Sequence, residues 1–338
     1  MQISEQVDRA ASEYVSMLAE AVAIPSVSAT RTHRHHVHAM ADWVVAQMHS
    51  LHISTEIRDP GLQMLDGESV ALPPVVLGRY GADSSKRTVL VYAHYDVQPA
   101  SREDGWRTDP FTLTADSHGR LFGRGATDDK GPLVAWLCVV HAHQQLGLAL
   151  PVNLLFCFEG MEESGSEGLD DIILHEASRY FAGVDCVCIS DNYWLGTERP
   201  CLTYGLRGVS TFQLAISGPG RDLHSGVFGG TVHEPMTDLV HLMAKLVDSA
   251  GSILVPGIYD SVAKTTDAEM QTYKHIQFQL SDIHNAAEAT NTIHSTPTEA
   301  LMARWRHPAL SLHGNPGLMQ ALKAPTTAQA QKLSSRQK

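Results

Sequence analysis

Three short runs of β-branched, aliphatic and aromatic residues constrain the fold of this chain most strongly: Thr88–Ala93, Val152–Phe158 and Val184–Ile189. Each has the length and composition of a buried strand. Helical stretches separate them, at Pro132–Gln145 and Leu169–Tyr180. Strands that alternate with helices predict an α/β fold, with a mixed, mainly parallel central sheet that helices cover on both faces.

The N-terminal segment precedes this sheet and reads as two helices. An amphipathic stretch, Val7–Val22, ends before Pro25, because a residue that precedes proline is pushed out of the helical region. A second helix is expected from about Thr32 to Leu51. It begins with a dense group of histidines, which we interpret as a solvated helix face because ligands of one enclosed site usually converge from different elements: His33, His35, His36 and His38.

A change of pattern near Tyr204–Arg207 predicts a domain boundary. Residues 1–204 are expected to form the main part of an α/β domain. Residues 205–322 are expected to form a partial α+β domain, with a strand at Val209–Ile216 and a helix at Glu234–Ser249. Residues 323–338 lack apolar periodicity, and we expect a loose, disordered tail there.

Polar side chains follow all three buried strands, at the edge where open α/β sheets place their sites. A glycine-rich loop, Leu121–Gly131, adds the pair Asp128–Asp129. Taken alone, each motif reads as an ordinary turn, an acidic helix start or a loop N-cap. Together they predict one shared site, built from His94 and Asp96 after the first strand, Glu159, Glu162 and Glu163 after the second, and Asp191 after the third.

Several carboxylates around one cleft would repel each other unless cations neutralised them. Oxygen-rich ligation with one histidine per ion suits Zn²⁺ or Mn²⁺, and a central carboxylate can bridge two such ions. In a hydrolytic site, a carboxylate that is not a ligand must take the proton from water, and Glu162 and Glu163 offer one candidate for each role. Asp96 lies on the same side of an extended chain as His94 and can accept a hydrogen bond from its second ring nitrogen.

Composition excludes several other classes of function. The formal net charge of −12 disfavours nucleic acids and anionic membranes as partners, and no apolar run approaches the length of a membrane span. The chain has neither a G-x-S-x-G elbow nor a P-loop. Its five cysteines lie mostly in apolar runs without a C-x-x-C pair, which favours reduced core thiols and a cytoplasmic location.

Five long segments closely resemble the carnosine-dipeptidase type of dinuclear metallopeptidase, in the aminoacylase superfamily. The similarity covers roughly Ser12 to Gly314. The segments that carry it are TVLVYAHYDVQPA (88–100), LFGRGATDDKGPL (121–133), PVNLLFCFEGMEESGSEGL (151–169), VDCVCISDNYWLG (184–196) and DLHSGVFGGTVHEPMTDL (222–239).

The resemblance implies a role for each site residue in the metal-dependent hydrolysis of dipeptides, for example of the carnosine or Cys-Gly type. The implied ligands are His94, Asp128 and Asp191 for one ion, and Asp128 and Glu163 for the other. Glu162 resembles the general base, with Asp96 behind His94. The resemblance also implies a cis peptide bond between Asp128 and Asp129. His224 resembles a histidine of the lid domain that reaches the site of the partner in a homodimer.

The likeness ends near Gly314, before the segment in which the family supplies further residues. From the sequence we therefore expect a truncated chain with an incomplete second metal site and low activity. Two alternatives remain open at this stage: deacylation of N-acyl amino acids, and a non-catalytic truncated homologue that dimerises through its lid.

Overall fold

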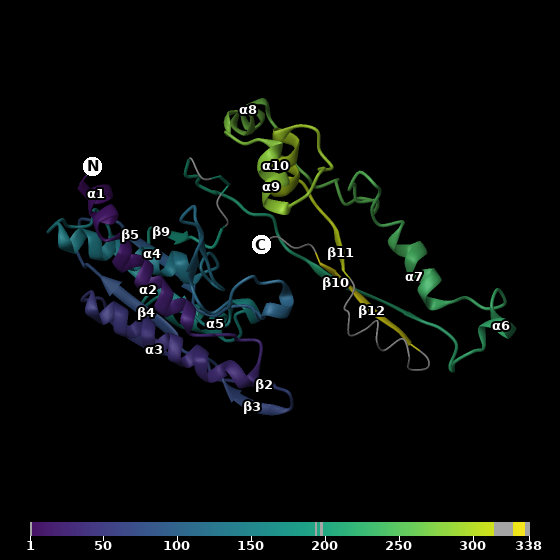
Figure 1. Ribbon diagram of the computed structural model, residues 1–338, viewed down its shortest axis with the longest axis horizontal. Helices are drawn as coiled ribbons and strands as arrows, with labels where there is room; N and C mark the ends of the chain where they lie inside the picture. The colour runs from purple at the N-terminus through teal and green to yellow at the C-terminus, as the bar shows by residue number, and fades with distance from the viewer. Residues whose placement is uncertain (1, 193–194, 197–198, 314–326, 335–338) are drawn as a thin grey trace. The chain divides into compact units, whose positions relative to one another are not determined.

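The computed structural model describes residues 2–192, 195–196, 199–313 and, for the backbone alone, 327–334. The chain divides into two compact units, residues 1–193 and 194–338. The predicted boundary at Tyr204–Arg207 therefore falls slightly inside the second unit. Figure 1 shows the first unit in purple to teal and the second in green to yellow.

A five-stranded sheet forms the centre of the first unit, in the order β1-β4-β8-β5-β9. β5 pairs in parallel with β8 and β9, whereas β4 pairs antiparallel with β1 and β8. The strands are β1 (Ser54–Arg58), β4 (Val75–Tyr80), β5 (Thr88–His94), β8 (Asn153–Glu159) and β9 (Cys186–Ile189).

The prediction of a mixed sheet is confirmed, but the sheet is not mainly parallel, because its β1 and β4 side is antiparallel. The connection from β1 to β4 contains only the hairpin of β2 (Leu62–Leu65) and β3 (Glu68–Ala71). A parallel pair needs a crossover of a dozen or more residues, usually a helix, and this hairpin supplies none.

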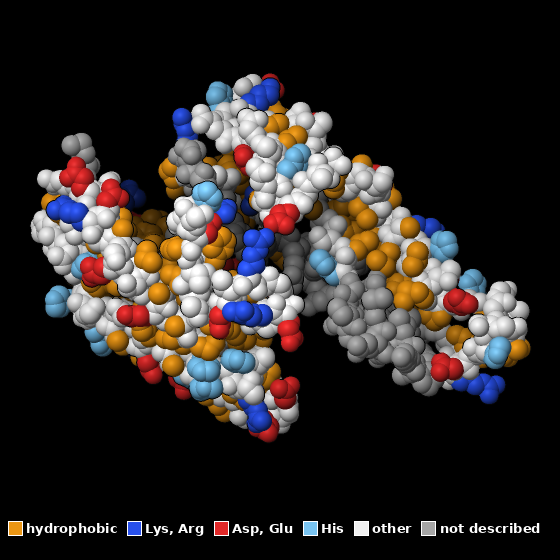
Figure 2. All heavy atoms as spheres, viewed as in Figure 1, with side chains coloured by type: hydrophobic (Ala, Val, Ile, Leu, Met, Phe, Trp, Pro, Cys, Tyr) orange, Lys and Arg blue, Asp and Glu red, His pale blue; other side chains and the backbone are white. Residues whose placement is uncertain are grey.

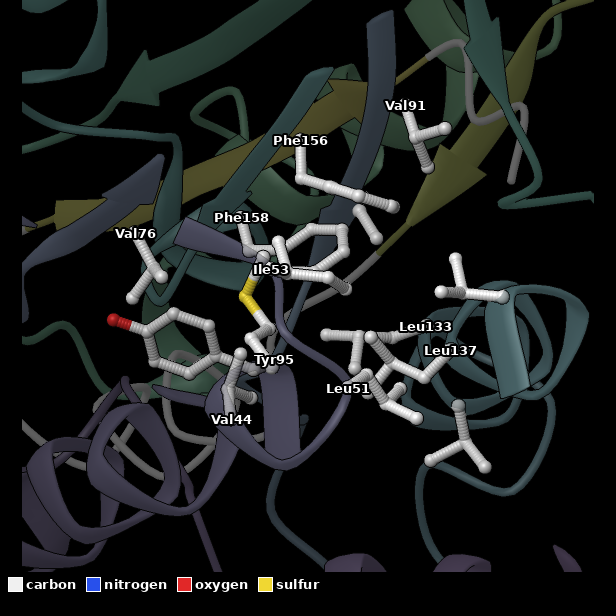
Figure 3. Packing of buried hydrophobic residues seen from close by; sticks show 14 of the residues in the cluster. Val44, Leu51, Ile53, Val76, Val91, Tyr95, Leu133, Leu137, Phe156 and Phe158 are labelled. Carbon is white, nitrogen blue, oxygen red and sulfur yellow. The ribbon is translucent and has the colours of Figure 1, made fainter. Parts of the chain in front are cut away.

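Helices cover both faces of this sheet. Alternate residues of β8 divide between the two cores, since successive side chains of a strand point to opposite faces. Leu154, Phe156 and Phe158 pack with one set of helices, and Leu155 and Cys157 pack with α5 (Leu169–Glu176). The first set comprises α2 (Ala11–Ala23), α3 (Arg34–Ser50) and α4 (Lys130–Gln145). Figure 3 shows the larger core, in which Phe156, Phe158 and Tyr95 are labelled.

The predicted N-terminal helix is split, because α1 (Gln2–Arg9) ends before α2 begins. The second predicted helix comprises a short 3-10 turn, η1 (Arg31–His33), followed by α3. The minor elements of the first unit are two more 3-10 turns and a small hairpin: η2 (Arg102–Asp104), η3 (Glu162–Ser164), β6 (Thr114–Ala115) and β7 (Leu121–Phe122).

The second unit contains a three-stranded antiparallel sheet in the order β10-β12-β11. Its strands are β10 (Thr211–Ser217), β11 (Ser311–His313) and β12 (Thr327–Ser334). The helices are α6 (Ser225–Phe228), α7 (Pro235–Met243), α8 (Asp267–His275), α9 (Leu280–Ala287) and α10 (Pro297–Trp305).

The expected tail, residues 323–338, is corrected in part, because β12 forms the middle strand of this sheet. Main-chain hydrogen bonds to β10 and β11 order this segment, and such pairing needs no apolar periodicity. Residues 323–326 and 335–338 lie outside the described residues.

All five cysteines are free, but they are not all core residues. Cys138 and Cys157 are buried, and burial raises the pKa of each thiol to about 12. Cys186 and Cys201 are exposed, which corrects the expectation of core thiols. Among the described residues, no helix combines the length and the apolar character that a membrane span requires.

Candidate metal centre

The predicted site residues of the first unit come from the ends of neighbouring strands. His94 is the last residue of β5, and Glu162 and Glu163 begin η3 directly after β8. Asp191 follows β9, and Asp128 lies in the loop before α4. Because β5, β8 and β9 run parallel, their carboxyl ends meet at one edge of the sheet and bring these side chains together.

Three carboxylates surround one nitrogen of the His94 ring. Nε2 of His94 lies 3.0 Å from Oδ1 of Asp128, 3.8 Å from Oε2 of Glu162 and 3.8 Å from Oδ2 of Asp191. The His94 side chain is fully buried, whereas each of the three carboxylate side chains is about one-fifth exposed (21–22%). The cluster can therefore be reached from solvent through its carboxylates.

Two overlapping groups within this cluster have the spacing of a metal site. The ligand atoms of His94, Asp128 and Glu163 all lie within 4.8 Å of one another, and the same is true of His94, Glu162 and Asp191. Both groups share His94, which is the last residue of the strand between β8 and β9. The structure therefore brings together five of the predicted site residues: His94, Asp128, Glu162, Glu163 and Asp191.

The donor set fits a divalent cation. Burial alone lowers the pKa of His94, but hydrogen bonds to Asp128, Asp191 and Asp96 outweigh this effect and raise that pKa well above its ordinary value. The carboxylates that favour a proton on this ring favour a divalent cation by the same electrostatic attraction. One imidazole nitrogen with several carboxylate oxygens suits Zn²⁺ or Mn²⁺.

Asp96 supports the cluster from behind, as predicted from its spacing. Its side chain is fully buried, and Oδ1 lies 3.2 Å from Nδ1 of His94. The main-chain oxygen of Asp96 lies 3.1 Å from the same nitrogen. These contacts hold the proton of a neutral ring on Nδ1 and leave Nε2 free to ligate a metal.

Asp129 holds the main chain of His94. Its Oδ2 accepts a hydrogen bond of 3.1 Å from the backbone N–H of His94, and its side chain is fully buried. Burial, reinforced by the negative charges of Asp191 and Asp128, raises the pKa of Asp129 to about 8. Asp129 is thus a buried support for the histidine, while Oδ1 of its neighbour Asp128 lies beside the ring. The peptide bond between these two residues is cis, which confirms the implied geometry.

Sequence reasoning did not identify two buried supports, Lys130 and Ser28. Nζ of Lys130 donates to the main-chain oxygens of Ala21 (2.8 Å) and Ile24 (2.6 Å), at the C-terminal end of α2. A lysine at a helix start is common on protein surfaces, so its residue type does not indicate this burial. Oγ of Ser28 donates to Oδ2 of Asp96 at 2.6 Å, and nothing in the local sequence indicates this contact.

His224 belongs to the second unit. It is the N-cap residue of α6, and its Nδ1 accepts a hydrogen bond of 3.0 Å from the backbone N–H of Gly226. The side chain is exposed. Its predicted role stays a prediction.

Comparison with known proteins agrees with this geometry. The model of peptidase family M20/M25/M40 matches residues 90–331, a range that includes every predicted site residue. The Cys-Gly metallodipeptidase of Schizosaccharomyces pombe is 56% identical over 326 residues, which are 96% of this chain and 68% of that protein. The Beta-Ala-His dipeptidase of Homo sapiens is 45% identical over 318 residues, which are 93% of this chain and 62% of that protein.

The chain belongs to peptidase family M20/M25/M40. Solved structures of M20 relatives match its fold. The crystal structure of human carnosine dipeptidase 1 has a TM-score of 0.86 and 42% identity, and the match covers 99% of this chain and 72% of that one. A di-peptidase from Saccharomyces cerevisiae also has a TM-score of 0.86, with 46% identity and coverage of 98% and 70%. This M20 peptidase thus spans about two thirds of the length of the relatives named here.

Proposed function

We propose that this chain hydrolyses the peptide bond of dipeptides in a reaction that depends on divalent metal ions. The observation that carries the proposal is the convergence of Asp128, Glu162 and Asp191 on Nε2 of His94, within 3.0 to 3.8 Å. The relatives named above as dipeptidases support the substrate class.

The proposed metal ligands are His94, Asp128 and Asp191 for one Mn²⁺ or Zn²⁺ ion, and Asp128 and Glu163 for a second ion. When bound, such ions lower the pKa of water and polarise a carbonyl oxygen. The ligand atoms of Asp128 and Glu163 lie close to those of His94, and the ligand atoms of Glu162 and Asp191 also lie close to those of His94, which supports one shared site for these residues. The expectation that the second site is incomplete stays a prediction.

Glu162 is proposed as the general base. Its carboxylate takes a proton from the attacking water and later delivers it to the leaving amine, so that no proton is gained or lost in the cycle. Oε2 of Glu162 lies 3.8 Å from His94 Nε2, beside the cluster. The side chain is about one-fifth exposed, which keeps it accessible to water and substrate.

A homodimer is part of the proposal, with His224 acting on a substrate held by the partner. The hydrogen bond from Gly226 to Nδ1 of His224 places the ring proton on Nε2. An exposed Nε2–H group can donate a hydrogen bond to the carbonyl oxygen of a substrate. We also propose a cytoplasmic location, which the five free cysteines support.

The test measures Cys-Gly hydrolysis and Mn²⁺ binding on the same preparations. Glu162→Gln is expected to lower kcat by roughly 10²- to 10⁴-fold and to keep Mn²⁺ binding, because only the proton acceptor is lost. Asp170→Asn, at an exposed position in the first turn of α5, is the matched control and should retain full activity. Hydrolysis that survives Glu162→Gln unchanged would rule out the proposed base.

A further inference from the structure

Ser28 is buried in the segment between α2 and η1. This segment contributes no residue to the candidate metal centre. Its hydroxyl donates to Oδ2 of Asp96 at 2.6 Å, the distance of a charge-assisted O–H···O⁻ hydrogen bond. The same Oγ lies 2.8 Å from Oγ of Ser164. The main-chain oxygen of Ser28 accepts a bond of 3.1 Å from the buried guanidinium of Arg34. Ser28 therefore has a fixed position from which it contacts two side chains behind the site.

The pair of Ser28 and Asp96 contacts every residue of η3. The backbone N–H of Glu162 donates to Oδ1 of Asp96 at 3.2 Å, and the backbone N–H of Glu163 donates to Oδ2 at 3.1 Å. Ser164, the last residue of η3, contacts the Ser28 hydroxyl. Both glutamates of the metal centre are thus held through their main chain by the carboxylate that also contacts the ring of His94.

Asp96 can serve both groups only while its carboxylate keeps one orientation. Oδ1 faces the His94 ring and the Glu162 amide, and Oδ2 faces the Glu163 amide. The Ser28 hydroxyl is bound to Oδ2 and opposes rotation of the carboxylate about its terminal bond. Without this donor, the carboxylate can rotate away from the amides, and the glutamate turn would no longer be fixed relative to His94.

We infer that Ser28 is a positioning residue for the metal centre: its hydroxyl fixes Asp96 and Ser164, so that His94, Glu162 and Glu163 are held together for divalent cations. The inference rests on the proposed function, since it assigns to Ser28 a part in the metal affinity of that same site. Hydrogen-bonded supports behind metal ligands commonly change metal affinity by roughly 10- to 100-fold when they are removed.

Ser26 provides a matched control on the same segment. It is fully buried, as Ser28 is, and its hydroxyl donates a bond of 2.7 Å to the main-chain oxygen of Tyr95. The Ser26 hydroxyl thus bonds the main chain of Tyr95 and not the Asp96 carboxylate. The segment itself is held by a bond from the Val97 amide to the Ser26 oxygen and by pairing of Val27 with Val97. Replacement of either serine by alanine therefore removes one buried hydroxyl and leaves these main-chain contacts in place.

The experiment measures Mn²⁺ binding by isothermal titration calorimetry, together with thermal unfolding, for the full chain and for Ser28→Ala and Ser26→Ala. We expect Ser28→Ala to weaken Mn²⁺ binding by roughly 10- to 100-fold, and Ser26→Ala to keep the affinity within about twofold, at similar losses in Tm. Ser28→Thr retains the hydroxyl and should recover most of the affinity.

Other outcomes separate this inference from the proposed function. Unchanged affinity in Ser28→Ala, or equal losses in both alanine variants, would overturn the role of Ser28 while the proposed function stands. Failure of the unmodified chain to bind Mn²⁺ would instead overturn the proposed function. If Ser28→Ala does not fold, Ser164→Ala decides: reduced affinity supports the inference, and full affinity overturns it.

Discussion

The two units of the chain differ in how their central strands are covered. All seven residues of β8 in the first unit are buried, whereas every residue of β10 in the second is exposed or half-buried. Hydrophobic side chains also gather on the visible surface over α7 (Figure 2), where Val240 is exposed. The candidate metal centre thus lies at the edge of a sheet whose central strand is covered on both faces. The second unit depends more on main-chain pairing and less on side-chain burial.

The largest expected effect comes from one phenylalanine in each unit. Phe156 in β8 is fully buried, and Phe156→Ala should lower the free energy of unfolding by about 3–5 kcal/mol. Phe212 in β10 is 61% exposed, and Phe212→Ala should cost less than about 1 kcal/mol. Urea unfolding followed by circular dichroism measures both. Equal losses would show that β10 is covered in solution.

A second comparison concerns histidines. His94→Ala removes a buried ring that faces three carboxylates, and we expect Mn²⁺ affinity to fall by at least roughly 100-fold. His224→Ala alters an exposed ring of the second unit and should leave Mn²⁺ affinity unchanged. Calorimetric titration of both variants checks the difference. Loss of Mn²⁺ binding in His224→Ala would contradict the assignment of the ligands to the first unit.

A third comparison uses a basic side chain at a helix end in each unit. Lys130 is fully buried and bonds two main-chain oxygens near the end of α2, so Lys130→Met should cost about 2 kcal/mol by leaving them unsatisfied. Arg207 is half-buried and donates to the main-chain oxygens of Ala303 and His307 near the end of α10. We expect Arg207→Met to cost about 1 kcal/mol. Urea unfolding measures both losses in the free energy of unfolding. A larger loss in Arg207→Met than in Lys130→Met would contradict this prediction.

The smallest effect concerns acid stability. A hydrogen bond from Arg58 is the main cause that lowers the pKa of Glu176 from its ordinary value of 4.5 to about 2. Because the folded-state pKa is the lower one, the ionised carboxylate stabilises the fold fully above pH 4.5. That stabilisation is lost as the pH falls toward 2. Glu176→Gln should therefore flatten the fall of Tm between pH 4.5 and 3.

Glu269→Gln in the second unit is the matched variant, since Glu269 pairs with Arg306 at 2.6 Å and both side chains are partly exposed. It should change Tm at pH 7 by less than Glu176→Gln does, because the Glu269 side chain is partly exposed whereas that of Glu176 is buried. A larger change of Tm in Glu269→Gln than in Glu176→Gln would contradict this prediction.

The sequence predicts those parts of the site that follow from spacing along one element. His94 and Asp96 are two residues apart on an extended chain, and Glu162 and Glu163 directly follow a buried strand, so their positions could be derived locally. The antiparallel side of the sheet, formed by β1 and β4, could not be derived in this way. Arg79 near the end of β4 and the charged residues of β1 mask the strand pattern, because that side of the sheet is partly exposed.

The sequence does not indicate the contacts between segments that lie far apart in the chain. Ser28 and Asp96 are 68 residues apart, and Lys130 is 106 residues from Ile24. A serine in a loop and a lysine at a helix start are common on protein surfaces, so their residue types carry no signal of burial. Only the packing of α2 and α4 against the sheet brings such residues behind the site.

The adjacent residues Asp128 and Asp129 contact His94 at its ring and at its main chain, respectively. Asp128 contacts the tip of the ring, and Asp129 contacts the backbone amide of the same residue. Because His94 is the last residue of β5 and is paired with Glu159 of β8, these two contacts tie the loop to the edge of the sheet. Substitutions in residues 121–127 should therefore disturb the geometry presented to a cation, most of all at Gly125, where φ is +83° and an added Cβ would lie 2.8 Å from Cγ1 of Val97.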